Sequence, residues 1–409
     1  MKSRINILER IFHIGAVAIL GVVVSHSASA GNPTAGDELL AAIPGNFQLA
    51  AIQYEGMLKS LKDDPQLPRT YEEGHLKTVK ITDWTSGFFP GSLWYLYEYT
   101  HKPEWQAAAK DYTGRLESIK DFTGDHDVGF MLGCSYGNGY RLTGDKRYRS
   151  VLAMGAKSLA TRFEPKVGMI RSWSHGSWKY PVIIDNMMNL ELLTWASREG
   201  GGAKLLEIAT SHADLTSNNH FREDSSSWHL VDYDPQTGAI LGKQTVQGFA
   251  DASAWARGQA WGLYGYTMMF RETKKQEYLA RARSIAKFIM SHPRLPEDKV
   301  PYWDFDAPAI PNAPRDASAA AVMASAFIEL SGFVGKAEGR EYFLLARQQL
   351  LAMSSPAYRA VPGGNGNFIL MHSVGHLPGN SEIDVPLNYA DYYFLEALLR
   401  YQALVNKMR

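Results

Sequence analysis

SAWARGQAW, residues 253–261, opens a segment in which apolar residues recur at helical spacing as far as residue 271. A surface helix normally carries an apolar stripe on one side and charged residues on the other. Residues 253–261 instead combine small residues, two tryptophans and one charged residue, Arg257. This composition predicts a helix that is surrounded by other parts of the fold.

Helical spacing of apolar residues recurs along the whole chain, and almost no segment alternates with the period of two that strands show. We predict twelve helices and therefore an all-α protein. The predicted segments are 37–62, 87–101, 103–121, 127–143, 145–162, 182–199, 202–221, 253–271, 275–292, 315–333, 337–354 and 385–407.

The connections between the predicted helices alternate in length. Short polar turns follow the even-numbered helices, whereas long loops rich in proline, glycine and aromatic residues follow odd-numbered helices, at 163–181, 222–252, 292–314 and 355–384. The even-numbered helices also begin with stretches similar in character to SAWARGQAW, namely WTSGFFPGSLW, DHDVGF, DNMMNL, RDASAAAV and PLNYADYYF. We therefore predict an (α/α)6 barrel of six inner and six outer helices, with a site at the N-terminal ends of the inner helices.

Residues 1–30 have the pattern of a secretory signal peptide. A basic leader precedes an apolar stretch at 11–24, and Ala28-Ser29-Ala30 forms an A-x-A cleavage site. The only cysteine, Cys134, is far from that site, which argues against a lipid anchor. We expect an exported protein without a membrane anchor, located in the periplasm.

Residues 31–409 show no linker and no change in composition, which predicts a single catalytic domain. The leader holds three of the 42 basic and one of the 42 acidic residues, so the remaining chain has a net charge of about −2. That balance argues against nucleic acid or a membrane surface as a partner. We expect a monomer or a weak homo-oligomer.

Two aspartates, Asp127 in DHDVGF and Asp185 in VIIDNMMN, lie at the starts of predicted helices. The positive end of a helix favours an ionised carboxylate, so we expect a lowered pKa for Asp127, with Asp125 as the N-cap. Apolar neighbours favour the neutral acid and should raise the pKa of Asp185. Two carboxyl groups with opposite shifts are typical of general acid chemistry on sugars. Helix capping is the alternative role for both, and spacing leaves the two roles equally open.

Asp125, His126 and Asp127 are metal-ligand residue types in one short segment. A matching cluster of histidines or cysteines with ligand spacing is absent from the rest of the sequence. We expect no metal and no other cofactor.

Arg257 and Trp261 are four residues apart and share a helix face, while Trp255 and Gln259 share the neighbouring face. A buried guanidinium needs an anionic partner because an unpaired buried charge is costly. A substrate carboxylate and an internal salt bridge would both meet this need, and spacing does not distinguish them. Among the aromatic residues that suit a carbohydrate cleft, we select Trp84, Trp255 and Trp261.

Several motifs, in order along nearly all of residues 31–409, resemble the unsaturated glucuronyl hydrolases of glycoside hydrolase family 88. They are DHDVGF, IIDNMMNLELL, the spacing of Gln247, Trp255, Arg257 and Trp261, YWDFDAP with RDASAAA, and HSVG with YADYYFLEAL. The resemblance implies an (α/α)6 barrel and a reaction that uses no metal or cofactor.

The resemblance also implies an unusual hydrolysis. The substrate is a lyase product of glycosaminoglycan type that ends in a 4-deoxy-4,5-unsaturated hexuronic acid, and water adds to this double bond instead of attacking the anomeric carbon. By similarity, Asp185 is the general acid/base that protonates C4, and Asp127 is its ionised partner. The predicted substrate-binding residues are Trp84, His126, His229, Thr245, Gln247, Trp255, Arg257, Trp261 and Ser373.

Two departures from the family pattern bear on the substrate. Val246 replaces a histidine that some members carry before the glutamine, and GHLPGNSEID (375–384) lacks the Ser-x-x-Ser-x-Lys of members that prefer sulfated glycosaminoglycans. The alternatives are an unsaturated rhamnogalacturonyl hydrolase acting on pectin fragments, a sugar epimerase and a non-catalytic glycan-binding protein. The DHD motif together with IIDN favours the glucuronyl type, and the aspartate pair argues against an epimerase.

Overall fold

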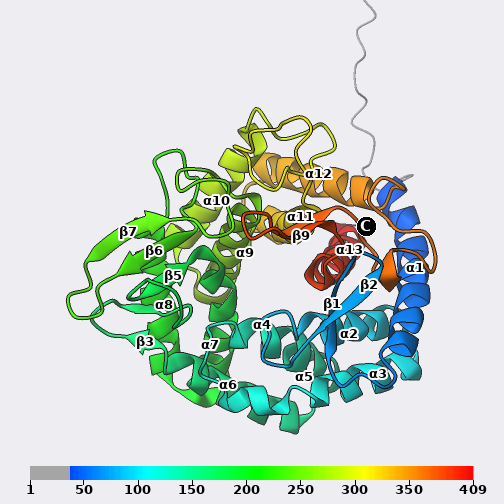
Figure 1. The fold of residues 1–409 in the computed structure, drawn as a ribbon, viewed down its shortest axis with the longest axis horizontal. Helices are drawn as coiled ribbons and strands as arrows, with labels where there is room; N and C mark the ends of the chain where they lie inside the picture. Colours follow the sequence, from blue (N-terminus) through cyan, green and yellow to red (C-terminus); the bar gives the residue numbers. More distant parts are fainter. Residues whose placement is uncertain (1–36, 409) are drawn as a thin grey trace, which may run out of the picture. The chain divides into compact units, whose positions relative to one another are not determined.

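The computed structural model describes residues 37–408, so the predicted signal peptide lies outside the described residues. Glu38–Arg409 forms one compact unit. Within it the helices form a ring that the chain follows from its blue beginning to its red end (Figure 1). The predicted (α/α)6 barrel is confirmed.

Six outer helices alternate along the chain with six inner segments. The outer helices are α1 (Glu38–Ser60), α3 (Pro103–Gly114), α6 (Lys146–Ala160), α8 (Ala203–Asn219), α10 (Gln276–Ser291) and α12 (Lys336–Met353). The inner segments are α2 (Phe88–Thr100), α4 (Val128–Leu132) continuing into α5 (Asn138–Thr143), α7 (Leu190–Ala196), α9 (Ala256–Thr273), α11 (Ala317–Ser331) and α13 (Asn388–Met408).

Burial explains why SAWARGQAW lacks a solvent face. Every residue from Ala256 to Phe270 of α9 is buried. The next outer helix, α10, buries only residues at helical spacing on one side, such as Tyr278, Ala282 and Ile285. The inner helix contacts neighbours all round, whereas the outer helix covers the ring with a single apolar stripe.

Two inner segments deviate from regular α-helix. A π-helical turn at Gly133–Gly137 separates α4 from α5, and a 3-10 helix, η3 (Ile184–Asn189), precedes α7. A second 3-10 helix, η1 (Glu117–Asp121), follows α3, so the predicted helix 103–121 is divided in two. Another π-helical turn, η4 (Ser197–Gly201), ends the α7 segment.

Short antiparallel strands occupy the long loops, which the sequence analysis did not predict. They are β1 (Leu67–Glu72) with β2 (His75–Val79), β3 (Phe163–Glu164) with β4 (Met169–Ile170), β5 (Pro181–Ile183) with β6 (Leu230–Tyr233) and β7 (Ile240–Gln244), and β8 (Ser373–His376) with β9 (Ser381–Val385). At two to six residues each, most are too short to show a clear period-two pattern.

The sheet β5-β6-β7 positions three chain segments at the barrel end. Ile183 pairs with Leu230, and Leu230 pairs with Gln244. Three predicted site residues lie at the ends of these paired strands: Asp185 soon after β5, His229 directly before β6 and Thr245 directly after β7. Pairing therefore brings together residues that are up to 60 positions apart in the sequence.

Glycine permits close approach of the inner segments near this end. A Cβ atom at Gly129 would lie 2.5 Å from the Cα of Asn189, and one at Gly87 would lie 2.4 Å from the carbonyl oxygen of Met131. Such distances exclude a side chain at either position without backbone movement.

The last helix closes the ring against the earlier inner segments. The hydroxyl of Tyr392 on α13 lies 3.0 Å from that of Tyr95 on α2, and the Asn138 amide of α5 donates to Tyr392 at 3.0 Å. Among residues 37–408, no helix has both the length and the apolarity needed to span a bilayer.

Candidate active site

Asp185 lies in the first turn of η3, two residues after the end of strand β5 and inside the helical turn rather than at its cap. Its carboxyl is buried, and Oδ2 has no hydrogen-bond partner. Burial raises its pKa to about 7, although Arg257 and the Trp261 indole act in the opposite direction. The upward shift that its apolar neighbours predict is confirmed.

Asp127 is the N-cap residue of α4, and its side chain makes no capping hydrogen bond. Its Oδ1 accepts a hydrogen bond from Asn189 Nδ2 at 2.9 Å. Burial, followed by the charge of Asp125, raises the pKa of Asp127 well above its usual value, and Asp185 adds a smaller effect in the same direction. The predicted lowering of this pKa is wrong because burial and neighbouring carboxylates outweigh the end of a five-residue helix.

Asp125 is not the N-cap that the sequence predicts. Its Oδ1 instead accepts the backbone N–H of Asp127, two residues on, at 3.1 Å. This local hydrogen bond turns the chain ahead of α4. It also keeps the Asp125 carboxylate close to Asp127.

Asn189 connects the segments that carry the two aspartates, and the sequence analysis missed it. Its Nδ2 donates to Asp127, while its Oδ1 accepts the backbone N–H of Phe130 at 2.9 Å. Asn189 follows Asp185 by four residues, a spacing that places both on one side of the α-helix that the sequence predicts for 182–199. That spacing was the available signal.

His229 has a defined tautomer. Its Nδ1 accepts backbone N–H groups from Val246 at 3.0 Å and Gln247 at 3.3 Å, so the ring proton is on Nε2. Nε2 lies 3.7 Å from Oδ2 of Asp185 and has no hydrogen-bond partner. Burial, followed by the positive charge of Arg257, lowers the pKa of His229 to about 3, so the ring is neutral.

Arg257 is buried and has an internal anionic partner. Its Nη1 lies 3.1 Å from Oδ2 of Asp316, and its guanidinium also donates to the carbonyl groups of Val374 and Gly375 in strand β8. The guanidinium lies 4.5 Å from the ring centre of Trp255. Of the two open interpretations, the internal salt bridge is present, and Nε remains buried without a partner.

Three predicted substrate-binding residues, Thr245, Gln247 and Ser373, lie in loops or strands and differ in their hydrogen bonding. The Gln247 side chain donates to the carbonyl of Gly375 at 3.2 Å, and Ser373 is buried with an unpartnered hydroxyl. Thr245 is used locally, because its hydroxyl accepts the backbone N–H of Gly248 at 2.8 Å. Its O–H donor remains, and its contact with substrate stays a prediction.

None of the three predicted tryptophans is exposed enough to offer a whole ring face to solvent. Trp84 is half-buried and lies 4.9 Å from the ring of Tyr389. Trp255 and Trp261 are buried, and Trp261 packs against Phe130 at 5.2 Å between ring centres. Tyr389 lies beside Trp84 but is not among the predicted substrate-binding residues. Its hydroxyl is buried and has no hydrogen-bond partner.

Several of the predicted site residues, together with Tyr389, have a buried polar atom without a hydrogen-bond partner. These atoms include Asp185 Oδ2, His229 Nε2, Arg257 Nε, Trp261 Nε1, Ser373 Oγ and Tyr389 Oη. Each such atom costs about 1–3 kcal/mol when it stays unpaired, and native proteins retain few of them. Unpartnered polar atoms on several predicted site residues are typical of a cleft that binds a polar ligand.

His126 lies beside the Asp127 carboxylate, with Nε2 3.5 Å from Oδ1. Burial lowers the pKa of His126 to about 4, so its ring is neutral. Within the described residues, donor atoms of Asp125, His126 and Asp127 lie within 4.8 Å of one another and could hold a cation. The expectation that the protein needs no metal stays a prediction.

Comparison with known proteins agrees with this geometry. The family model of Glycosyl Hydrolase Family 88 matches residues 62–351. The chain is 46% identical over 332 residues to an unsaturated glucuronyl hydrolase of Formosa agariphila, covering 80% of this chain and 82% of that protein. It is 33% identical over 331 residues to an unsaturated chondroitin disaccharide hydrolase of Streptococcus agalactiae, covering 80% and 83%.

The fold is similar to solved structures of the same kind. A crystal structure of an unsaturated glucuronyl hydrolase specific for heparin has a TM-score of 0.86 and 48% identity, covering 90% of this chain and 98% of that chain. The unsaturated glucuronyl hydrolase of Bacillus sp. GL1 has a TM-score of 0.81 and 28% identity, covering 90% and 97%. The chain belongs to glycosyl hydrolase family 88. It is a glycoside hydrolase, similar to unsaturated glucuronyl hydrolases, and the alternative of a non-catalytic glycan-binding protein is not supported.

Proposed function

We propose that this enzyme removes the terminal 4-deoxy-4,5-unsaturated hexuronic acid from lyase-generated glycosaminoglycan oligosaccharides. The observation that carries the proposal is the buried Asp185 carboxyl, whose pKa is about 7 and whose Oδ2 is unpartnered. A carboxyl of this kind holds a proton near neutral pH and can transfer it to a substrate atom. The similarity to glucuronyl and chondroitin disaccharide hydrolases favours this substrate class over pectin fragments.

The reaction begins with proton transfer from Asp185 to C4, where the π electrons of the double bond form the new C–H bond. A water molecule then bonds to C5, and its proton passes to the Asp185 carboxylate, which restores the acid. The C5 hydroxyl proton moves to the ring oxygen as the bond from C5 to that oxygen breaks. The hemiacetal left at C1 then collapses to an aldehyde: its hydroxyl proton passes to the glycosidic oxygen as the bond from C1 to that oxygen breaks, which releases the aglycone sugar.

His229 fits this sequence as a neutral donor. Its Nε2 lies 3.7 Å from Oδ2 of Asp185, a distance that is too long for a hydrogen bond and leaves the carboxyl oxygen available. A charged imidazolium at the same place would lower the pKa of Asp185 and weaken it as an acid at neutral pH. The backbone N–H groups of Val246 and Gln247 maintain the neutral ring.

Asp127 acts beside the sugar hydroxyls, with its position set by Asn189. Burial, followed by the charge of Asp125, raises its pKa, so its carboxyl takes up a proton more readily than an exposed aspartate does. As positive charge develops on the ring, the ionised form is favoured, so Asp127 stabilises the transition state more than the ground state.

Deuterium labelling tests the chemistry. In heavy water, the released uronic acid should carry deuterium at C4, detected by NMR, because the proton on Asp185 exchanges with solvent. Attack at the anomeric carbon would leave C4 unlabelled and the double bond intact, which would overturn the proposal.

A disaccharide panel tests the substrate class. Unsaturated heparin, chondroitin, hyaluronan and rhamnogalacturonan disaccharides are compared by the loss of double-bond absorbance. The heparin substrates come first, because a 48% identical structure is of a heparin-specific hydrolase. Preference for rhamnogalacturonan would favour the pectin alternative.

We also propose that the enzyme works in the periplasm as a monomer or a weak homo-oligomer without a membrane anchor. The pattern of residues 1–30 and the position of Cys134 support the location. Cell fractionation and light scattering of the purified enzyme test these points, and activity that sediments with membranes would contradict them.

A further inference from the structure

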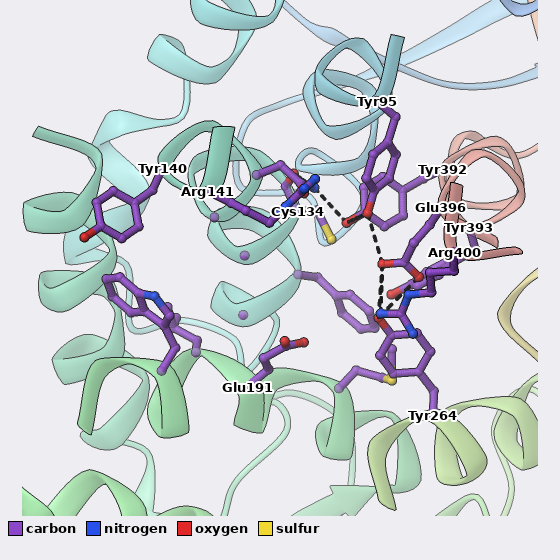
Figure 2. A pocket seen from close by; sticks show the side chains of 18 of the residues that line it. Tyr95, Cys134, Tyr140, Arg141, Glu191, Tyr264, Tyr392, Tyr393, Glu396 and Arg400 are labelled. Atoms are coloured by element: carbon purple, nitrogen blue, oxygen red, sulfur yellow. Dashed lines mark hydrogen bonds and ion pairs between the residues drawn. The ribbon is translucent and has the colours of Figure 1, made fainter. Parts of the chain in front are cut away.

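A second cavity of about 650 Å³ opens among the inner segments, further along them than the catalytic residues (Figure 2). Residues of α2, α5, α7, α9 and α13 line it, and neither Asp127 nor Asp185 is among them. Phe130 and Tyr393, which line this cavity, both pack on Trp261 and so separate it from the catalytic cleft. The proposed hydrolysis makes no use of this cavity.

Seven aromatic side chains contribute to the lining. They are Tyr95, Phe130, Tyr140, Trp195, Tyr264, Tyr392 and Tyr393. Aromatic ring faces carry partial negative charge and attract cations. The volume is sufficient for a ligand of about monosaccharide size.

The arginines of the cavity are already engaged by carboxylates. Arg141 makes two hydrogen bonds to Glu98, and Arg198 pairs with Glu272. Arg271 and Arg400 share Glu329 behind the wall. These arginines therefore offer little free positive charge to an anionic ligand.

Glu191 and Glu396 complete the lining, which holds four carboxylates and four guanidiniums, and Glu329 behind it brings this ion-pair group to five carboxylates. The pairing partners are Glu191 with Arg271 and Glu396 with Arg400. The group carries about one net negative charge, which favours a cationic ligand.

Glu191 is the carboxylate best placed to meet a ligand. Its side chain is 45% exposed, and Figure 2 shows the carboxylate pointing into the open middle of the cavity. It contacts Arg271 through Oε1. Desolvation is the main cause that raises its pKa; Arg271 and Arg400 oppose this rise, and Glu329 and Glu272 add to it.

We propose that this cavity binds a small organic cation with a primary ammonium group, which pairs with Glu191 and lies among the tyrosine rings. Hydroxyl groups on the ligand would find partners in the tyrosine hydroxyls and the guanidiniums at the wall. Glucosamine has this chemistry and size. N-acetylglucosamine has a similar shape without the charge and is the matched control ligand.

Calorimetric titration at about pH 6, where the glucosamine amine is protonated, tests the proposal. We expect glucosamine to bind with millimolar affinity and N-acetylglucosamine to bind at least about tenfold more weakly. Glu191→Gln should weaken glucosamine binding by a similar factor. Glu341→Gln, an exposed change outside the cavity, should leave it unchanged.

A cavity-filling variant distinguishes this site from the catalytic cleft. Gly133 lines the cavity, has helical backbone angles (φ −62, ψ −46), and a Cβ placed there meets no atom within 4 Å. Gly133→Leu should therefore fold and abolish glucosamine binding. Binding that survives in Gly133→Leu, equal binding of N-acetylglucosamine, or no measurable binding to the unsubstituted protein would each overturn the proposal. The titration does not depend on turnover, so its result is separate from that of the proposed hydrolysis.

Discussion

The Asp185 carboxyl is buried, and its neighbours leave one of its oxygens, Oδ2, without a hydrogen bond. Arg257 and Trp261 limit the rise of its pKa, and burial still raises it to about 7. The carboxyl is therefore partly protonated at neutral pH and remains acidic enough to transfer its proton. This balance suits protonation of carbon, which needs an acid that is protonated near neutral pH and shielded from bulk water.

Substitution of Asp185 tests its role directly. Asparagine is nearly the same size but cannot supply the proton, so Asp185→Asn should lower kcat/KM by at least about 10²-fold. The rate is measured by loss of double-bond absorbance, and helical circular dichroism reports the fold. Loss of both signals would indicate a structural role instead.

The pH dependence follows from the raised pKa of Asp185. The reactive form of Asp185 is protonated. We therefore expect kcat/KM to be highest below about pH 7 and to fall about tenfold per pH unit above it. A rate profile over the neutral and alkaline range measures this limb. A rate that is constant through that range would exclude Asp185 as the acid.

Metal removal tests the group formed by Asp125, His126 and Asp127. Oδ1 of Asp127 already accepts a hydrogen bond from Asn189, and the proposed chemistry uses the carboxyl proton of Asp185. Incubation with a chelator followed by dialysis should leave kcat/KM unchanged. An activity loss that added Ca²⁺, Mn²⁺ or Zn²⁺ restores would contradict this prediction.

At the scale of elements, three short strands and one asparagine assemble the catalytic groups. The sheet β5-β6-β7 aligns the segments that carry Asp185 and His229, with Ile184 N–H donating to the His229 carbonyl at 2.9 Å. Asn189 then links η3 to α4 through Phe130 and Asp127. The geometry of the site depends on how closely these elements approach.

Substitution of Gly129 tests how close the approach of α4 to η3 must be. Because a Cβ there would lie 2.5 Å from the Asn189 backbone, Gly129→Val should lower the free energy of unfolding by about 1–3 kcal/mol and reduce activity. Denaturant unfolding and kcat/KM are measured together. Gly133→Ala, where a Cβ meets nothing within 4 Å, is the matched control and should be neutral or slightly stabilising. Equal behaviour of the two variants would contradict the interpretation.

At the scale of the molecule, the ring is closed by buried polar contacts between helices that are distant in sequence. Glu396 of α13 accepts hydrogen bonds from Tyr95 of α2, Tyr264 of α9 and Ser325 of α11. It also pairs with Arg400 one helical turn later. One carboxylate thus connects four inner helices.

Removal of this carboxylate should weaken the whole ring. Glu396→Ala leaves three hydroxyls and part of the Arg400 charge unsatisfied, so we expect the free energy of unfolding to fall by about 2–5 kcal/mol in urea. The exposed control Glu341→Ala should change it by less than about 0.5 kcal/mol. A small effect at Glu396 would mean that solvent in the neighbouring cavity replaces its contacts.

The sequence by itself determined the helical class, the alternation of inner and outer helices and the raised pKa of Asp185. These depend on local composition: α9 lacks a polar face because it is enclosed, and Asp185 follows three apolar residues. The order of motifs also identified the family. Local patterns of this kind can be read without knowing which segments meet.

Only the tertiary structure decided the pKa of Asp127, the partner of Arg257 and the contributions of Asn189 and Tyr389. Each depends on the folded surroundings: the barrel buries Asp127, and Arg257 meets Asp316 and strand β8. Burial and charge–charge interactions fall off over a few ångströms of space and do not follow sequence separation. A helix start therefore predicted an ionised Asp127, whereas its enclosed surroundings in the barrel favour the protonated form.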